Sequence, residues 1–242
     1  MYAGIDLAAD AKRTGLAMVS GEVSSVISVA QLGADDDAVV DAIVMADRAG
    51  IDVPLGWPDE FVRFIQAHAS GDTERTERAD TRWRRRLAMR VTDEDVYGRT
   101  GLTPLSVSTD RIAHPAMRWS GLEARLHGCG VGIARDGSGA VCEVYPAGAL
   151  RCWSLPHRGY KGAKNIATRA ELVAALSQRF TELDWNGFDE SCVADDNILD
   201  AVIAALMARE VAHGRGVPPP ADARDSARRE GWIWLPQEKV GL

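Results

Sequence analysis

Three of the most strand-like segments of this 242-residue chain each carry one acidic residue among apolar neighbours. The acids are Asp6, Asp52 and Glu143. Successive side chains of a strand point to opposite faces, so each acid points away from both of its apolar neighbours. A carboxylate in the middle of a mixed sheet needs a partner, because burying an unpaired charge is costly. Any fold of this chain therefore has to bring these acids to counterions or to a shared ligand.

A fourth acid, Asp200, lies at the start of a predicted helix from Ile198 to Val211 that is rich in alanine. Small residues on this helix would let it lie close against a sheet. Asp196 and Asn197 share a helix face with Asp200. Simpler interpretations remain open for single residues. Asp195 and Asp196 are both candidates for the helix cap, with Asp196 favoured; Asp200 can interact with the helix dipole, and Asp6 can end its strand and cap the next turn.

The N-terminal third predicts the element order β-β-β-α-β. Strand character covers Tyr2 to Leu7, Thr14 to Ser20 and Ser24 to Leu32, which indicates a three-strand meander. A helix follows the acidic run at Asp35 and is expected to end at Gly50. The next strand spans residues 51–53 and is stopped by a proline at 54.

The rest of the chain predicts mainly helices. We expect helices within 60–90, 108–127, 146–153, 169–183 and 198–211, a fifth strand over 140–145, and a last short strand or docking segment at 231–235. We interpret the chain as a single domain over residues 1–242. It contains a mainly helical insertion at about 58–138 and ends in a C-terminal docking segment at 215–242.

Composition excludes several classes of protein. The chain has 28 Lys+Arg against 35 Asp+Glu, a net charge of −7, which rules out a polybasic protein. Its longest apolar run, Ala201 to Ala208, is far short of the ~20 residues of a membrane helix. The N-terminus shows no export signal, so we expect a cytoplasmic protein without a membrane partner. The cysteines and histidines lack metal-ligand spacing, so zinc sites and disulfides are not expected.

Convergence of the acids would require metal ions. Two carboxylates about 4 Å apart repel by ~4 kcal/mol at an effective dielectric constant near 20, a large part of a domain stability of roughly 5–15 kcal/mol. Mg²⁺ or Mn²⁺ prefers oxygen ligands and removes this repulsion. A pair of such ions can activate water and stabilise the leaving oxygen in phosphodiester cleavage. The acids therefore favour a metal-dependent nuclease.

The order of elements and of acids resembles the RNase H-like fold. The short phrases of the chain are similar to one family in particular, the predicted RNase H-like nucleases grouped as domain of unknown function 429. The matching phrases run through most of the chain in order: Gly4-Ile5-Asp6-Leu7-Ala8 with Lys12 and Thr14-Gly15, Ile51-Asp52-Val53-Pro54-Leu55-Gly56-Trp57-Pro58, Arg90-Val91-Thr92-Asp93, Pro104-Leu105-Ser106-Val107, Glu143-Val144-Tyr145-Pro146-Ala147, Tyr160-Lys161-Gly162 and Leu199-Asp200-Ala201-Val202.

This resemblance implies an α/β fold with a mixed five-stranded sheet, a three-strand antiparallel meander plus parallel strands, flanked by helices. It also implies that Asp6, Asp52, Glu143 and Asp200 are catalytic acids that bind Mg²⁺ or Mn²⁺. Holliday-junction resolvases of this fold carry two acids three residues apart on the late helix. Here the position three before Asp200 is Asn197, so a second metal site would need Asp196 in its place.

A nucleic-acid substrate needs cations along its phosphates. Candidate substrate-binding residues lie in or beside the motif loops: Lys12, Arg90, Thr92, Asp93 and Lys161. Thr92 and Asp93 can instead cap a helix. The arginines from Arg82 to Arg86 are interrupted by Trp83. They can bind a nucleic-acid strand by charge and by stacking, or they can form a solvated helix face.

Two other functions stay open beside the nuclease. One is a non-catalytic binding or scaffold module that keeps the fold without turnover. The other is an actin-like or sugar-kinase-type ATP-binding domain, because Asp136-Gly137-Ser138-Gly139 resembles its second phosphate loop. That class normally has two such sheets and a Gly-rich adenosine loop, which this chain lacks. Metal-dependent hydrolysis separates the nuclease from the scaffold, and stabilisation by ATP alone would favour the ATP-binding domain.

Overall fold

A computed structural model describes residues 1–21, 24–72 and 78–237. The chain has a mixed α/β fold whose seven strands form one sheet in the order β6-β3-β2-β1-β4-β5-β7. The strands are β1 (Tyr2–Asp6), β2 (Gly15–Ser20), β3 (Ser25–Leu32), β4 (Arg48–Asp52), β5 (Val141–Val144), β6 (Leu183–Asp184) and β7 (Ile233–Trp234). The helices are η1 (Ala11–Arg13), α1 (Asp36–Met45), α2 (Asp59–Ser70), α3 (Thr81–Ala88), α4 (Val91–Thr100), α5 (Ala113–Gly128), α6 (Pro146–Cys152), α7 (Ile166–Arg179), α8 (Asp189–Ala194), α9 (Asp196–Ala212) and α10 (Arg224–Glu230).

Strands β1, β2 and β3 form the predicted antiparallel meander, and β4, β5 and β7 add to it as parallel strands. The prediction of five strands was wrong, because β6 pairs with β3 and β7 pairs with β5 at the two edges. Each of these edge strands has two residues. Strand β7 lies in the segment 231–235, which was predicted as a short strand or docking segment. Strand β6 was not predicted, because a segment of two residues shows no alternation that would distinguish it from a loop.

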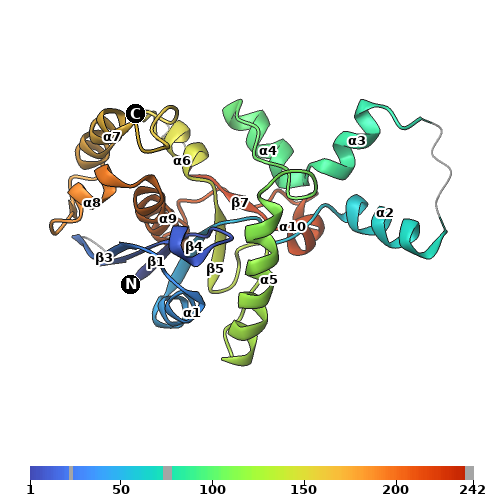
Figure 1. Cartoon of the computed structure of the whole chain (residues 1–242), viewed down its shortest axis with the longest axis horizontal. Helices are drawn as coiled ribbons and strands as arrows, with labels where there is room; N and C mark the ends of the chain where they lie inside the picture. Colours follow the sequence, from blue (N-terminus) through green and yellow to red (C-terminus); the bar gives the residue numbers. More distant parts are fainter. Residues whose placement is uncertain (22–23, 73–77, 238–242) are drawn as a thin grey trace.

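Helices cover both faces of the sheet (Figure 1). One face packs against α1 and α5, whose side chains share a core with Ala3 and Ile5 of β1. The other face packs against α9, and Tyr2 of β1 belongs to the core on that side. Odd and even positions of β1 therefore face different helical layers, as the two-residue period of a strand requires.

Helix α9 lies in backbone contact with the centre of the sheet. A Cβ atom on Gly4 of β1 would lie 2.0 Å from the carbonyl oxygen of Ala201, and one on Gly50 of β4 would lie 2.3 Å from that of Ala204. Only glycine leaves room for this approach. The prediction that Gly50 ends a helix was wrong: α1 ends at Met45, and Gly50 lies inside β4 where α9 crosses it.

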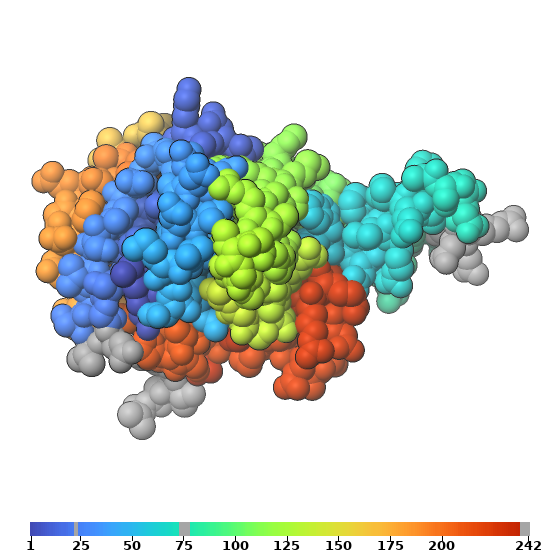
Figure 2. All heavy atoms as spheres, turned by 90° about the horizontal axis from the view of Figure 1, so that it is seen from below, coloured from blue at the N-terminus to red at the C-terminus, as the bar shows by residue number. Residues whose placement is uncertain are grey.

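Helices α2 to α5 lie between β4 and β5 along the chain, and α2 and α3 project from the body (Figures 1 and 2). The predicted helical stretch from 60 to 90 consists of these two separate helices. Residues 73–77, which join them, lie outside the described residues. In the part of the chain that the structure describes, no helix has the length and apolar character needed to span a membrane.

Candidate functional site

The site begins where β1 and β4 end side by side. Asp6 is the last residue of β1 and Asp52 the last of β4, and the parallel register pairs the two directly. Neighbouring strands lie ~4.8 Å apart, and paired residues of parallel strands point to the same face. Asp6 shares its face with Gly4, and Asp52 shares its face with Gly50. Both carboxylates therefore point to the side of the sheet on which α9 lies.

Asp200 comes to the same place from α9, because Ala201, the next residue, touches the backbone at Gly4. The Asp200 side chain is fully buried. Its Oδ1 accepts a hydrogen bond of 2.8 Å from the hydroxyl of Tyr160, and its Oδ2 lies 2.7 Å from Nζ of Lys161. The structure thus brings together three of the predicted acids, Asp6, Asp52 and Asp200, with one lysine among them.

All three aspartates have raised pKa values. Burial raises the pKa of Asp6 well above its ordinary value, and the charges of Asp200 and Asp52 raise it further. Burial raises the pKa of Asp52 to about 7, with Asp200 and Glu143 adding to the rise and Lys161 opposing it. Burial also raises the pKa of Asp200, which Lys161 and Tyr160 oppose. The single ammonium group of Lys161 therefore does not balance the negative charge of this cluster.

Glu143, the fourth predicted acid, is neutralised by a guanidinium. Arg90 Nη2 lies 2.6 Å from Glu143 Oε1, and Arg90 Nη1 lies 2.8 Å from Oε2. The main-chain N–H of Leu55 also donates to Oε2 at 3.0 Å. Asp93 binds the other edge of the same guanidinium. Because all four groups are buried, Glu143 belongs to a buried ion-pair network beside the aspartates and is not an open ligand.

This network corrects part of the predicted substrate site. Arg90, Thr92 and Asp93 are at most 1% exposed, so a substrate phosphate cannot reach them. Thr92 Oγ1 accepts a hydrogen bond from the N–H of Ile233, and Asp93 caps α4 by accepting from the N–H of Arg90. Asp93 therefore has the helix-capping role that the sequence left open as an alternative. Lys12 is exposed in η1, the turn that follows β1.

The loop that carries Lys161 is clamped by Arg169, a residue of α7 that the site prediction missed. Arg169 is fully buried and donates to the carbonyl oxygens of Tyr160 at 2.8 Å and Gly162 at 2.7 Å. It also binds the carbonyl oxygens at the end of α8. The sequence contains a usable indication: Arg169 lies at helical spacing with Leu172, Val173 and Leu176, all on the buried face of α7.

Asp196 supports the same loop, because its Oδ1 accepts from the N–H of Gly162 at 3.0 Å. Its charge raises the pKa of Asp6 and Asp200. The interpretation of Asp196 as the helix cap was wrong. Asp195 caps α9 by accepting from the N–H groups of Asn197 and Ile198.

The arginine cluster of α3 forms a solvated helix face with ion pairs. Arg85 pairs with Glu94, and Arg86 pairs with Glu60. Trp83 packs edge-on against Phe64 of α2 with ring centroids 5.6 Å apart. Two of these cations are thus already paired, and the indole ring joins α3 to α2.

The aspartate cluster has the chemistry that a hard divalent cation needs. Its carboxylates supply oxygen ligands, and their raised pKa values show that they have too little compensating positive charge around them. The arrangement is not a closed cage. Within residues 1–21, 24–72 and 78–237, no three His, Cys, Asp or Glu side chains stand close enough together to hold a metal ion. A cation shared by all three aspartates therefore requires these side chains to move, and it would compete with Lys161 for Asp200 Oδ2.

The chain matches a protein-family model. The model of a family described as "Protein of unknown function (DUF429)" matches residues 4–225, which include all the residues of the cluster. No curated protein and no solved structure matches the chain.

Proposed function

The chain belongs to the DUF429 family of proteins of unknown function, and from this premise we propose that it is a metal-dependent nuclease. The observation that carries the proposal is the gathering of Asp6, Asp52 and Asp200 from two strands and a helix at one end of the sheet, with raised pKa values. Acidic side chains with strongly raised pKa values that gather at one place are typical of functional sites.

The topology supports the RNase H-like part of the proposal. The resemblance implies an antiparallel meander followed by parallel strands, and β1 to β3 with β4 and β5 have this arrangement. It also implies acids in the first strand, in the strand after the first helix and at the start of a late helix. Asp6, Asp52 and Asp200 occupy these places.

In this proposal Asp6, Asp52 and Asp200 hold Mg²⁺ or Mn²⁺. When bound, such an ion lowers the pKa of water and stabilises the leaving oxygen of a phosphodiester. Tyr160 orients Asp200 through its hydroxyl, and Lys161 supplies a positive charge at the edge of the cluster. Glu143 does not bind the ion in this proposal. Its hydrogen bonds with Arg90 and with the main-chain N–H of Leu55 fix the loop that follows Asp52.

The test is hydrolysis of single-stranded DNA, single-stranded RNA and a branched DNA in Mn²⁺ and in EDTA. We expect Mn²⁺-dependent cleavage of at least one substrate, and its loss in Asp6→Asn. Asp41→Asn is the matched control, because Asp41 is exposed on α1 across the sheet. Equal activity in Asp6→Asn and in the control would refute the assignment, and so would absence of cleavage by the wild type.

One observation favours a second candidate, a binding module without turnover. Two of the four predicted acids already have cationic partners, Glu143 with Arg90 and Asp200 with Lys161. A module of this kind would bind nucleic acid equally in Mn²⁺ and EDTA and cleave none. The ATP-binding alternative has less support, because Asp136 and Ser138 lie in a turn before β5, at the opposite end of that strand from Glu143. There the main-chain N–H and the hydroxyl of Ser138 donate hydrogen bonds to Asp136.

A further inference from the structure

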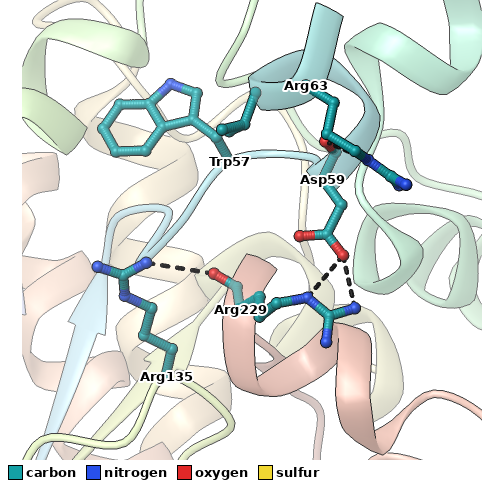
Figure 3. A pocket seen from close by; sticks show the side chains of 6 residues that line it. Trp57, Asp59, Arg63, Arg135 and Arg229 are labelled. Atoms are coloured by element: carbon teal, nitrogen blue, oxygen red, sulfur yellow. Dashed lines mark hydrogen bonds and ion pairs between the residues drawn. The ribbon is translucent and has the colours of Figure 1, made fainter. Parts of the chain in front are cut away.

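A hollow of about 480 Å³ lies beside the loop that follows β4 (Figure 3). Its volume falls in the range of roughly 300–1,000 Å³ that is usual for ligand pockets. Residues from four segments line it: Trp57, Asp59, Val62, Arg63, Arg135 and Arg229. None of them belongs to the aspartate cluster, so the proposed metal chemistry leaves the hollow without a role.

Hydrogen bonds to one carboxylate and close packing of the backbone fix the walls of the hollow. Glu230 of α10 accepts hydrogen bonds of 2.8 Å from the N–H groups of Asp59 and Val91, which ties α10 to the starts of α2 and α4. A Cβ on Gly56 would lie 2.5 Å from the carbonyl oxygen of Arg229, so the loop after β4 presses directly on α10. These contacts hold the lining segments in place before any ligand arrives.

The apolar part of the lining suits a flat ring. Trp57 is half-buried and packs against the core on the α1 and α5 side, which limits the movement of its indole. Val62, 50% exposed, is a second apolar residue of the lining. An indole held by its own core packing is a stacking platform, and bases stack on such platforms with little dependence on sequence.

The polar part of the lining carries net positive charge. Asp59 binds Arg229 through Nε at 2.8 Å and Nη2 at 2.6 Å (Figure 3). Arg135 binds Glu123, a residue of α5, at 3.0 and 3.2 Å. Arg63 donates instead to the main-chain oxygen of Asp59, an uncharged acceptor. Two carboxylates thus balance two guanidinium groups, and Arg63 adds one positive charge in a chain whose net charge is −7.

We infer that this hollow binds one nucleotide of a single-stranded nucleic acid, with the base against Trp57 and Val62 and a phosphate near Arg63. The inference rests on the proposed function, since it places in the hollow a nucleotide of the same nucleic acid that is cleaved at the aspartate cluster. Trp57 follows Asp52 by five residues, at most about 17 Å of extended chain. At ~3.4 Å per stacked nucleotide, a few nucleotides bridge that distance.

Binding of a short fluorescein-labelled oligothymidylate, followed by fluorescence anisotropy in EDTA, tests this inference without cleavage. We expect Trp57→Leu to weaken binding about tenfold, within the range of one base–aromatic stack. The logarithm of the binding constant falls linearly with the logarithm of the salt concentration, and Arg63→Gln should make this slope less steep by about 0.7, the value for one phosphate contact on single-stranded nucleic acid. Arg125→Gln is the matched control, because Arg125 is exposed on α5 and pairs with Asp37.

Trp57→Leu also removes core packing, so its melting temperature has to be measured beside its affinity. Arg63→Gln changes an exposed residue of α2 and keeps the test valid if Trp57→Leu unfolds. Unchanged affinity and salt slope in Arg63→Gln would overturn the inference. If the wild type cleaves in Mn²⁺ while binding is unaffected in both variants, the hollow alone is refuted. If the variants lose binding while the wild type cleaves nothing, the hollow stands and the nuclease proposal fails.

Discussion

Lys161 Nζ lies 2.7 Å from Oδ2 of Asp200, the one fully buried aspartate of the cluster. The lysine comes from a loop clamped by Arg169, and more than half of its side chain is exposed. Asp200, Asp52 and Asp6 all raise the pKa of Lys161, with Asp200 contributing most. The ammonium group therefore stands where added positive charge relieves repulsion among all three carboxylates.

Removing this ammonium should destabilise the metal-free protein. We expect Lys161→Met to lower the free energy of unfolding by roughly 1–3 kcal/mol, the usual cost of losing a charged hydrogen bond, towards the lower end because the lysine is partly exposed. Urea unfolding in EDTA measures the change. Lys164→Met, an exposed lysine three residues further along the same segment, is the control. Equal loss in both variants would show that the cluster does not depend on Lys161.

Removing Arg90 should be more damaging, because it would leave Glu143 and Asp93 buried without their counterion. Breaking a buried ion pair from one side typically costs about 3–5 kcal/mol, so we expect a loss of that size in Arg90→Met. Thermal unfolding with and without Mn²⁺ measures it. If Mn²⁺ restored the stability of this variant fully, Glu143 would be acting as a metal ligand, contrary to the structure.

The raised pKa of Asp52 predicts how stability depends on pH. The carboxyl titrates near 3.8 when unfolded and near 7 when folded. Between these values the unfolded chain binds fewer protons, so raising the pH favours unfolding. Asp52→Asn removes this contribution. From about pH 4 to pH 7, the free energy of unfolding of the variant should therefore rise relative to that of the wild type. A constant difference between the two in urea titrations would contradict the raised pKa.

Gly4→Ala tests the contact that places Asp200. Its Cβ would lie 2.0 Å from the carbonyl oxygen of Ala201, so β1 and α9 would have to separate. We expect destabilisation of roughly 1–3 kcal/mol or more, as for overpacked cores. Gly98→Ala is the control, since a Cβ there meets open space inside α4. Helix propensity predicts a gain of up to about 1 kcal/mol in the control. A harmless Gly4→Ala would contradict the close packing of α9.

Much of the central sheet could be predicted from the sequence. Alternating apolar residues mark β1 to β3, and the acid that interrupts each pattern marks β1, β4 and β5. The alanine-rich helix from Ile198 was expected to lie on the sheet, and α9 does so at Gly4 and Gly50. Register then follows from topology, which is why Asp6 and Asp52 are neighbours.

Other features depend on contacts between segments that are distant in the sequence. Arg90 and Glu143 are 53 residues apart, and nothing local in either segment indicates that they pair. Gly50 looked like a helix end because its neighbours do not show that a helix crosses there. The hollow beside Trp57 is likewise assembled from four separate segments. A single sequence does not reveal that α10 completes it.

A crystal soaked in Mn²⁺ and measured at the manganese absorption edge tests the central claim most directly. The account predicts an anomalous peak among the carboxylates of Asp6, Asp52 and Asp200, with Lys161 displaced from Asp200. Absence of a peak there at saturating Mn²⁺, with the ion pair between Lys161 and Asp200 intact, would contradict it.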